Sequence, residues 1–443
     1  MSLYTAADGL LGTHVTWGEV EEEMQKALGT TATFGDDKTV TNISDMKGFM
    51  SRIALVEPKW VGAADEEKLP EKFIVKISSQ LPFIEMTKLM DFSAEDFWDD
   101  AKLKGMGEVT RLLHNREVAT YKILMREKHP LIPFTKNFQT EIQQILNLMK
   151  NFFLIQIYAL KPFDDENTLK AYIISEYFPN TYHIGMHESI PAEDLLPIVH
   201  GAAAFSAIGM KLSEEETKYA RGMHFLDMVF EQFMDEKSNV KMEEMMRKAF
   251  PEEYSEKVEK MLKINKDYYL NKNMLPNFKN TCEFFGYQPV LTHSDLWSSN
   301  FLCGKEGEKV TLKAIIDYQT VSITTPAQDV GRLFASCLST KDRREKVDYL
   351  LEEYYKTFVK ELDGMDVPYT LQNLKDSYQV FFPLMSCMVL PGIAPMLEHA
   401  PHLSEEDKEA MKEVAMAKMV GLLEDVISTH ESSIQKFPKY FEF

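Results

Sequence analysis

Two polar strings stand in the second half of the sequence: His293-Ser294-Asp295-Leu296-Trp297-Ser298-Ser299-Asn300 and, after a short predicted hairpin, Ala314-Ile315-Ile316-Asp317-Tyr318-Gln319. They place an aspartate, then an asparagine five residues on, then a second aspartate beyond the hairpin. Phosphoryl transfer from ATP uses this set of groups, because one carboxylate accepts the proton of the attacking hydroxyl while an amide oxygen and a second carboxylate hold magnesium. The strings therefore predict a phosphotransferase site.

Each of these residues also has a purely structural interpretation. Asp295 could be an ordinary turn aspartate after a strand, and Asp317 could cap the apolar run from Leu312 to Ile316. The spacing of Asp295 and Asn300 favours catalysis, since a five-residue loop lets a carboxylate and an amide face the same phosphate oxygen. Asp317 comes directly after that apolar run, at a position where phosphoryl transfer needs a magnesium ligand. Hard oxygen donors such as carboxylates suit that ion.

The composition is that of a large acidic globular protein. The chain has 443 residues, 44% of them hydrophobic, and a formal net charge of −20. This length is sufficient for a large core and indicates two lobes or domains. The acidic residues are spread along the chain, so they would repel nucleic acid and anionic membrane surfaces. We therefore expect neither a nucleic-acid partner nor a membrane partner.

The four cysteines, Cys282, Cys303, Cys337 and Cys387, are expected to be free thiols. They form no CxxC pair, and none lies near a histidine at metal-ligand spacing. This pattern argues against both a disulfide framework and structural zinc. The N-terminus lacks the basic and apolar regions of a signal peptide, and no apolar run approaches the roughly 20 residues that span a bilayer. The expected location is the cytoplasm.

The first 178 residues combine short strands with a few helices. Thr16 and Glu19 form a capping box before a helix that ends at Gly29. An inserted helical segment precedes a long helix from about Glu108 to Lys128. Short runs rich in β-branched residues predict strands at residues 32–43, 49–56, 72–77, 152–160 and 169–178.

After Pro179 the pattern is mainly helical. Helices are predicted at residues 192–210, 222–234, 242–249, 254–269, 328–338, 343–362, 371–389 and 405–428. A strand-rich segment from Pro289 to Tyr318 carries both polar strings. We therefore predict an α+β, bilobal, protein-kinase-like fold. Residues 1–178 form a small β-rich N-lobe with the N-terminal helix, the nucleotide-binding sheet and the inserted segment, and residues 179–443 form a helical C-lobe with the catalytic hairpin at 289–319 and the substrate cleft.

The two strings resemble those of the choline-kinase and aminoglycoside-phosphotransferase superfamily, which shares the protein-kinase fold. Within it, the chain is most similar to the ecdysteroid-kinase-like branch, also called CHK kinase-like, from about Asp36 to about Leu423. The resemblance implies ATP and magnesium as cofactors. It also implies that Asp295 is the catalytic base and that Asn300 and Asp317 are the metal ligands.

The resemblance further implies a phosphate-binding lysine in the N-lobe. Lys76 lies on a predicted strand similar to the kinase Val-Ala-Ile-Lys strand and would bind the α- and β-phosphates. A lysine on an amphipathic strand is otherwise usually solvated. Glu117, in the middle of the long helix, would pair with Lys76, and Glu108 and Glu127 are the alternative partners.

Two further nucleotide contacts are implied in the same way. Gly48 and Ser51 belong to the loop of residues 46–51, which would lie over the phosphates. Glu176 and Phe178 belong to the Ser-Glu-Tyr-Phe string, which would form the hinge and offer backbone groups to adenine.

Three departures from protein kinases favour a small-molecule kinase. The sequence contains no G-x-G-x-x-G, so its phosphate loop has only Gly48. It has Asp317-Tyr318-Gln319 where protein kinases have Asp-Phe-Gly, and no Ala-Pro-Glu string follows. We also interpret His293 as a structural residue that bonds the backbone, Trp297 as a core residue, and Asp329 as a buried acid at a helix start that holds the catalytic loop.

The sequence thus predicts an enzyme, a kinase that transfers phosphate from ATP to a hydroxyl of a small molecule. The resemblance implies a steroid-like or other lipophilic alcohol as acceptor, with choline-like and detoxification substrates as further classes. One alternative is a pseudokinase that binds nucleotide or ligand without transfer. Another is a protein kinase, which the missing activation segment argues against. The sequence indicates no oligomeric state.

Overall fold

The computed structural model describes residues 2–44, 50–89, 100–132, 155–232, 236–307, 309–398, 400 and 403–443. The chain divides into two compact units, which are described separately. Unit 1 comprises Met1–Lys128 and Pro133–Asn180, and unit 2 comprises His129–Ile132 and Thr181–Phe443.

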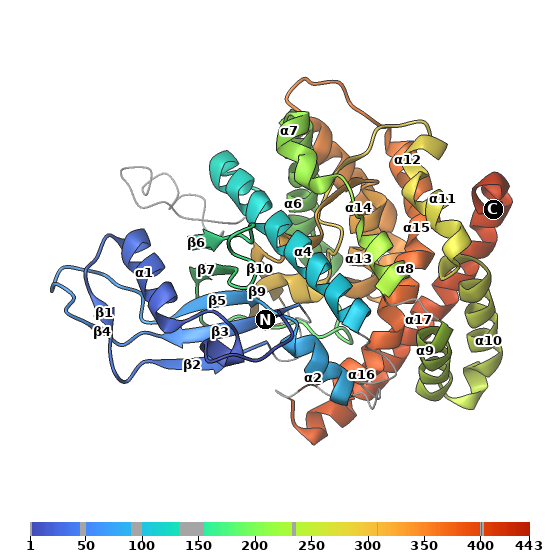
Figure 1. Cartoon of the computed structure of the whole chain (residues 1–443). Helices are drawn as coiled ribbons and strands as arrows, with labels where there is room; N and C mark the ends of the chain where they lie inside the picture. The colour runs from blue at the N-terminus through green and yellow to red at the C-terminus, as the bar shows by residue number, and fades with distance from the viewer. Residues whose placement is uncertain are drawn as a thin grey trace. The chain divides into compact units, whose positions relative to one another are not determined.

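Unit 1 is built on a five-stranded antiparallel sheet of order β2-β3-β5-β7-β6 (Figure 1). Its strands are β2 Thr39–Asn42, β3 Ser51–Glu57, β5 Phe73–Ser78, β6 Ile157–Lys161 and β7 Tyr172–Glu176. The central strand β5 alternates, so that Phe73, Val75 and Ile77 are completely buried on one face. Lys76 therefore lies on the other face, paired in register with Ile53 of β3 and Ile173 of β7.

Helix α1, Trp17–Leu28, covers the buried face of this sheet. Thr16 caps it through the predicted capping box, and Gly29 ends it in a left-handed conformation, with φ of 67°. Val20 and Met24 are fully buried in the same core cluster as the buried face of β5. The predicted N-terminal helix is therefore confirmed.

Some N-terminal predictions were wrong in their bounds. The strand predicted at 32–43 is two strands, β2 and the short β1 Thr33–Phe34, separated by a turn. The short strand β4, Trp60–Val61, which pairs with β1, was not predicted. Helix α2 spans Leu81–Leu89, and α4 spans Asp100–Glu127. Helix α4 thus begins before the predicted Glu108, because its two glycines weaken a helix without ending it.

Unit 2 is mainly helical, as predicted. Its helices are α6 Ala192–Lys211, α7 Glu214–Thr217, α8 Phe225–Gln232, α9 Glu236–Ala249, α10 Ser255–Ile264, α11 Leu275–Lys279, α12 Thr281–Phe284, α13 Ala327–Cys337, α14 Thr340–Glu361, α15 Leu371–Val389, α16 Ile393–Glu398 and α17 Glu405–Lys436. Its strands form two antiparallel pairs, β8 Val290–Thr292 with β11 Ser322–Thr324 and β9 Phe301–Glu306 with β10 Lys309–Ile315. Strand β11 lies beyond the predicted strand-rich segment.

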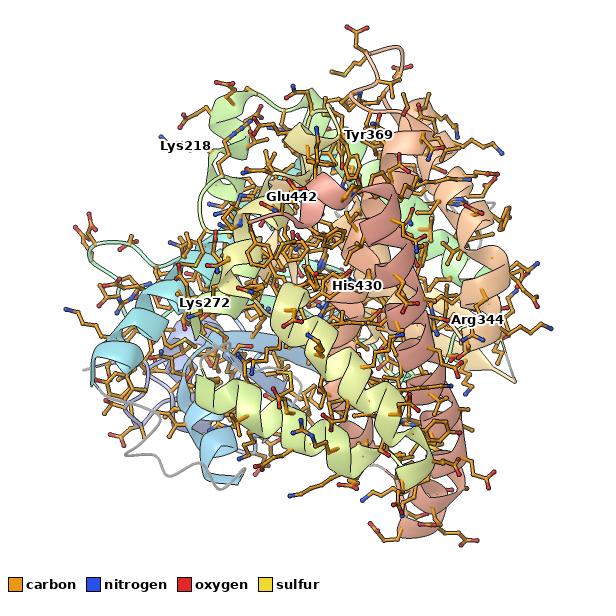
Figure 2. The ribbon with its side chains drawn as sticks, turned by 90° about the vertical axis from the view of Figure 1, so that its right-hand side faces the viewer. Lys218, Lys272, Arg344, Tyr369, His430 and Glu442 are labelled. Atoms are coloured by element: carbon orange, nitrogen blue, oxygen red, sulfur yellow. The ribbon has the colours of Figure 1, made fainter. Side chains whose placement is uncertain are left out.

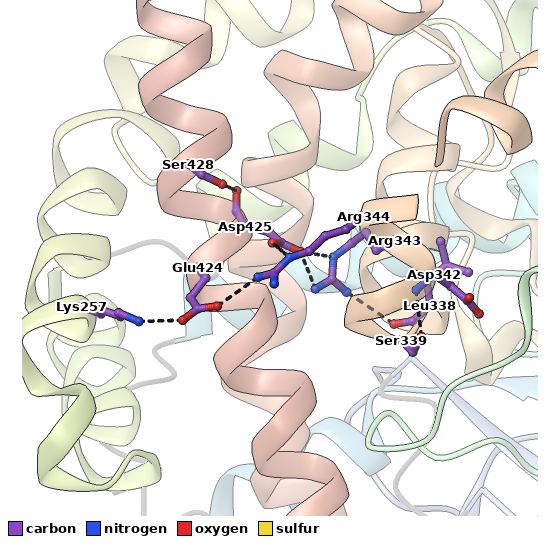
Figure 3. Close-up of polar contacts among 9 residues, drawn as sticks. All are labelled: Lys257, Leu338, Ser339, Asp342, Arg343, Arg344, Glu424, Asp425 and Ser428. Atoms are coloured by element: carbon purple, nitrogen blue, oxygen red, sulfur yellow. Dashed lines mark hydrogen bonds and ion pairs between the residues drawn. The ribbon is translucent and has the colours of Figure 1, made fainter. Parts of the chain in front are cut away.

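Helices α10, α15 and α17 pack side by side around the core of unit 2 (Figure 2). A charged network ties α14 to α17. Arg343 and Arg344 both contact Asp425 at 2.7 Å, and Arg344 also reaches Glu424, which accepts from Lys257 of α10 at 2.6 Å (Figure 3). This network fixes the long helix α17 against two neighbours.

The expectation that no apolar run is long enough to span a bilayer is wrong for one described stretch. Leu371–Glu398 is long and apolar enough to cross a membrane, but 67% of its apolar 18-residue window is buried inside the structure. It consists of α15 followed by α16 and contributes Phe381 and Leu384 to the core of unit 2. This burial is that of a core helix. The predicted fold class, α+β with a small sheet-rich N-terminal part and a larger helical part, is confirmed.

Candidate functional site

The site in unit 2 begins where strand β8 ends. Ser294 has a left-handed backbone with φ of 68°, and Asp295 follows it directly. Left-handed non-glycine residues are uncommon and cluster where surrounding structure holds a functional loop. Asp317, at the end of β10, has a second left-handed backbone with φ of 66°. Two sharp reversals of the chain thus carry the two aspartates that the sequence singled out.

The hairpin of β9 and β10 brings the two strings together. Phe301 pairs with Ile315, and the Ile316 amide donates to the Asn300 carbonyl at 2.9 Å. Asn300 and Asp317 therefore stand at the open end of the same hairpin. The structure brings Asp295, Asn300 and Asp317 onto neighbouring segments, while their catalytic and metal-binding roles stay predictions.

A buried carboxylate holds the loop that precedes Asp295. Asp329, at the start of α13, is completely buried and accepts from the His293 amide at 2.8 Å and the Ser294 amide at 2.7 Å. Burial raises the pKa of Asp329 to about 6. The His293 ring contacts the Ile316 carbonyl through Nε2 at 3.0 Å and so ties the loop to the hairpin. The predicted structural roles of Asp329 and His293 are confirmed.

Asp295 is held from two sides. Asn300 donates through Nδ2 to the Asp295 carbonyl at 2.8 Å and to its Oδ2 at 3.3 Å. Arg332 of α13 approaches from the other side, with its Nε 2.6 Å from Oδ1 of Asp295. The two atoms form an ion pair, but their angles do not meet the geometry of a hydrogen bond. Among the described residues, neither atom makes a hydrogen bond.

The chemistry of Asn300 and Asp317 fits a magnesium ion bound with a nucleotide. The Asn300 amide nitrogen is used by Asp295, so its oxygen Oδ1 is the group that remains for a metal. Asp317 adds a carboxylate, one oxygen of which accepts from Gln319 at 3.4 Å. Magnesium is usually held by one or two such oxygen ligands plus substrate phosphates. In the described ranges, no three His, Cys, Asp or Glu side chains gather at one metal position.

Unit 1 contains the predicted lysine and glutamate as an ion pair. Lys76 Nζ of β5 lies 2.6 Å from Oε2 of Glu117 on α4, and their side chains are 15% and 1% exposed. The structure thus selects Glu117 over Glu108 and Glu127, the alternatives that the sequence left open. A lysine fixed on a central strand by a buried carboxylate can present its charge to a phosphate.

The positions of the other predicted nucleotide-binding residues do not indicate whether these residues contact a nucleotide. Ser51 is buried at the start of β3, opposite Ser78, and Gly48 lies outside the described residues. Glu176 ends β7 and donates its backbone amide to the Gln156 carbonyl at 2.8 Å, so that amide is not available to adenine. Phe178 is buried. The hinge assignment stays a prediction.

Sequence reasoning missed Arg332. It lies three residues after Asp329 on α13, so both side chains share one side of the helix and point to the same loop. The sequence did contain a signal for Arg332. Asp329 was predicted to hold the loop, and a residue one helical turn after Asp329 is expected to face the same loop.

A family model described as "Uncharacterized oxidoreductase dhs-27" (DUF1679) matches residues 3–155 and 140–434. The chain is also similar to the "Uncharacterized kinase-like protein D1044.1" of Caenorhabditis elegans, with 23% identity over 268 residues, 57% of this chain and 65% of that protein. This chain thus spans less than two thirds of the length of that relative.

Solved structures show distant likenesses. A choline kinase from Cryptosporidium parvum has 12% identity and a TM-score of 0.43, over 91% of this chain and 93% of that chain. An ethanolamine kinase from Plasmodium vivax has 14% identity and a TM-score of 0.40, over 87% and 82%. A microcompartment-associated aminopropanol kinase has 11% identity and a TM-score of 0.40, over 89% and 94%.

Proposed function

The chain belongs to the family described as "Uncharacterized oxidoreductase dhs-27", and from its residues we propose that it is an ATP- and magnesium-dependent phosphotransferase acting on a hydroxyl of a small molecule. One observation carries the proposal. Asp295, Asn300 and Asp317 stand on two segments that are bonded to each other through the Ile316 amide and the Asn300 carbonyl, and the segment before Asp295 is bonded to the buried Asp329.

The chain's own residues perform most of the proposed reaction by positioning and electrostatics. Asp295 accepts the proton of the acceptor hydroxyl and orients that hydroxyl, while Asn300 holds the carboxylate in place. Bound magnesium supplies positive charge at the phosphates, and Asn300 and Asp317 would hold it. Lys76, fixed by Glu117, is assigned to the α- and β-phosphates. We propose a lipophilic or steroid-like alcohol as the acceptor class to examine first.

The oxidoreductase named in the family description finds no support in the architecture. Binding a nicotinamide or flavin dinucleotide in the usual way requires a parallel sheet with a glycine-rich turn between a strand and a helix. Every strand pair in the described part of the chain is antiparallel. The sequence also lacks the G-x-G-x-x-G string.

A second candidate function is a pseudokinase that binds nucleotide without transfer. The observation that favours it is the ion pair of Asp295 with Arg332, which occupies one oxygen of the proposed base. Among the residues that the structure describes, the second oxygen, Oδ2, is held by the longer contact from Asn300, at 3.3 Å. We favour the phosphotransferase because this oxygen can still accept a proton.

Substituting Asp295 by Asn tests the proposal. We expect ATP- and magnesium-dependent phosphorylation of an alcohol to fall at least about 100-fold, the lower range for loss of a positioned base, while ATP binding persists. Asp376→Asn is the matched control, since Asp376 is 17% exposed and pairs with Lys436 at 2.7 Å, compared with 16% and 2.6 Å for Asp295.

The control should keep its activity. Full activity of Asp295→Asn would contradict the assignment of the base. Magnesium-dependent ATP binding by the wild type, without transfer to any alcohol in a broad panel, would support the pseudokinase instead.

A further inference from the structure

The Arg332 guanidinium lies over two aromatic rings next to the proposed base. Its Cζ is 5.3 Å from the ring centroid of Trp297 in the loop and 5.4 Å from that of Phe225 on α8. The Arg332 side chain is 12% exposed, and its Nε is 2.6 Å from Asp295. An arginine stacked on aromatic faces and paired with a carboxylate is held firmly in one place.

The same few residues contain a cluster of buried polar atoms without hydrogen-bond partners. Within the described ranges these atoms are His293 Nδ1, Trp297 Nε1, Ser298 Oγ and Ser299 Oγ, while Asp295 Oδ1 and Arg332 Nε, which also lack hydrogen-bond geometry, face each other as an ion pair. Buried polar groups in folded proteins nearly always have a partner, so a local group of exceptions requires an explanation. Next to a proposed base, the simplest explanation is that a ligand supplies the partners, for example through an oxygen atom that accepts from the indole.

Two aromatic faces and a carboxylate are the elements with which proteins recognise organic cations. In this protein, the chain's own arginine already occupies both faces and pairs with the carboxylate. A substrate with a positive charge near its hydroxyl would meet a like charge instead of an aromatic cage.

We propose that Arg332 is a specificity-determining residue, an internal cation that excludes positively charged acceptors and selects neutral or anionic alcohols. The inference rests on the proposed function for its consequence, because it concerns the acceptor of that reaction. The part of the inference that concerns structure, that Arg332 occupies a site for cations, can be tested by measuring the binding of a cation without any activity assay.

The test measures binding of tetramethylammonium by isothermal titration to the wild type and to Arg332→Ala. The variant frees both rings and removes the cationic partner of Asp295. We expect it to bind tetramethylammonium at least about tenfold more tightly than the wild type, a difference of about 1.4 kcal/mol. Arg332→Lys keeps the charge and should bind no more tightly than the wild type.

Arg343→Ala is the matched control. Arg343 also pairs with a carboxylate, Asp425, and lies 5.9 Å from the centroid of an aromatic ring, Phe382. Arg344 still neutralises Asp425 in that variant, so no free acidic site for a cation arises. We expect Arg343→Ala to lose stability without gaining affinity for tetramethylammonium.

One result would overturn the inference: a folded Arg332→Ala that binds tetramethylammonium no more tightly than the wild type does. If the alanine variant does not fold, Arg332→Gln takes its place under the same criteria. A companion assay compares phosphorylation of choline and of its neutral isostere 3,3-dimethylbutan-1-ol. Gain of cation binding, together with no phosphorylation of any alcohol in the broad panel, would refute the proposed function while leaving the role of Arg332 in place.

Discussion

Replacing Asp329 by Asn removes one support of the loop that precedes Asp295, the proposed base. The buried carboxylate accepts from two backbone amides, at 2.7 Å from Ser294 and 2.8 Å from His293. The amide of asparagine has one acceptor oxygen and one donor group, so one of the two backbone amides loses its acceptor. We expect Asp295 to move with the loop and turnover to fall by roughly 100-fold, the typical effect of a misplacement by about 1 Å.

Two effects of this substitution on stability oppose each other. The amide left without an acceptor costs about 1–3 kcal/mol. Burial raises the pKa of Asp329 from 3.8 to about 6, so a neutral side chain relieves roughly 3 kcal/mol of charge burial at pH 7, at about 1.4 kcal/mol per pKa unit. The two nearly cancel at neutral pH, and we expect the variant to fold about as stably as the wild type.

The pH dependence distinguishes the two effects. A carboxyl whose pKa is raised in the folded protein contributes stability that is fully present below its unfolded pKa of 3.8 and is lost as the pH rises through 6. Urea unfolding followed by circular dichroism should show wild-type stability falling by about 2 kcal/mol relative to Asp329→Asn between about pH 4.5 and 7.5. A difference that stays constant over this range would refute the reasoning.

Two further substitutions test the packing of unit 2. Lys418→Met should cost about 2–4 kcal/mol in urea unfolding, since the buried ammonium donates to the carbonyls of Met186, Glu188 and Ser336 at 2.9, 2.5 and 2.6 Å; unchanged stability would contradict this. Asp425→Asn should cost about 3 kcal/mol because it leaves the buried Arg343 without its carboxylate. A thermal melt that matches the wild type would show that the network in Figure 3 adds no stability.

The elements that the sequence predicted well are those with local signals. Thr16 and Glu19 marked the start of α1, because a capping box is contained in four residues. Strand β4 was missed because it has two residues and exists through pairing with β1, some 25 residues earlier in the chain. The same reason applies to β11, which pairs with β8 across the whole hairpin of β9 and β10.

In the candidate site, too, the residues with local sequence signals were predicted, and the choices that depend on tertiary contacts were left open or missed. The spacing within the two strings was sufficient to place Asp295, Asn300 and Asp317 around one hairpin. The choice of Glu117 for Lys76 needed the packing of α4 on the sheet, which periodicity alone does not give. Arg332 was missed because a charged residue on an amphipathic helix is usually solvated, and only tertiary structure shows it over two aromatic rings.

The most direct test of the phosphotransferase assignment is phosphorus NMR of ATP, magnesium and a panel of alcohols with the wild type and with Asp317→Asn. We expect the wild type to form a phosphomonoester and ADP, and we expect neither product from Asp317→Asn or from the wild type without magnesium. Equal product formation by Asp317→Asn, or intact ATP with the wild type across the panel, would contradict the account.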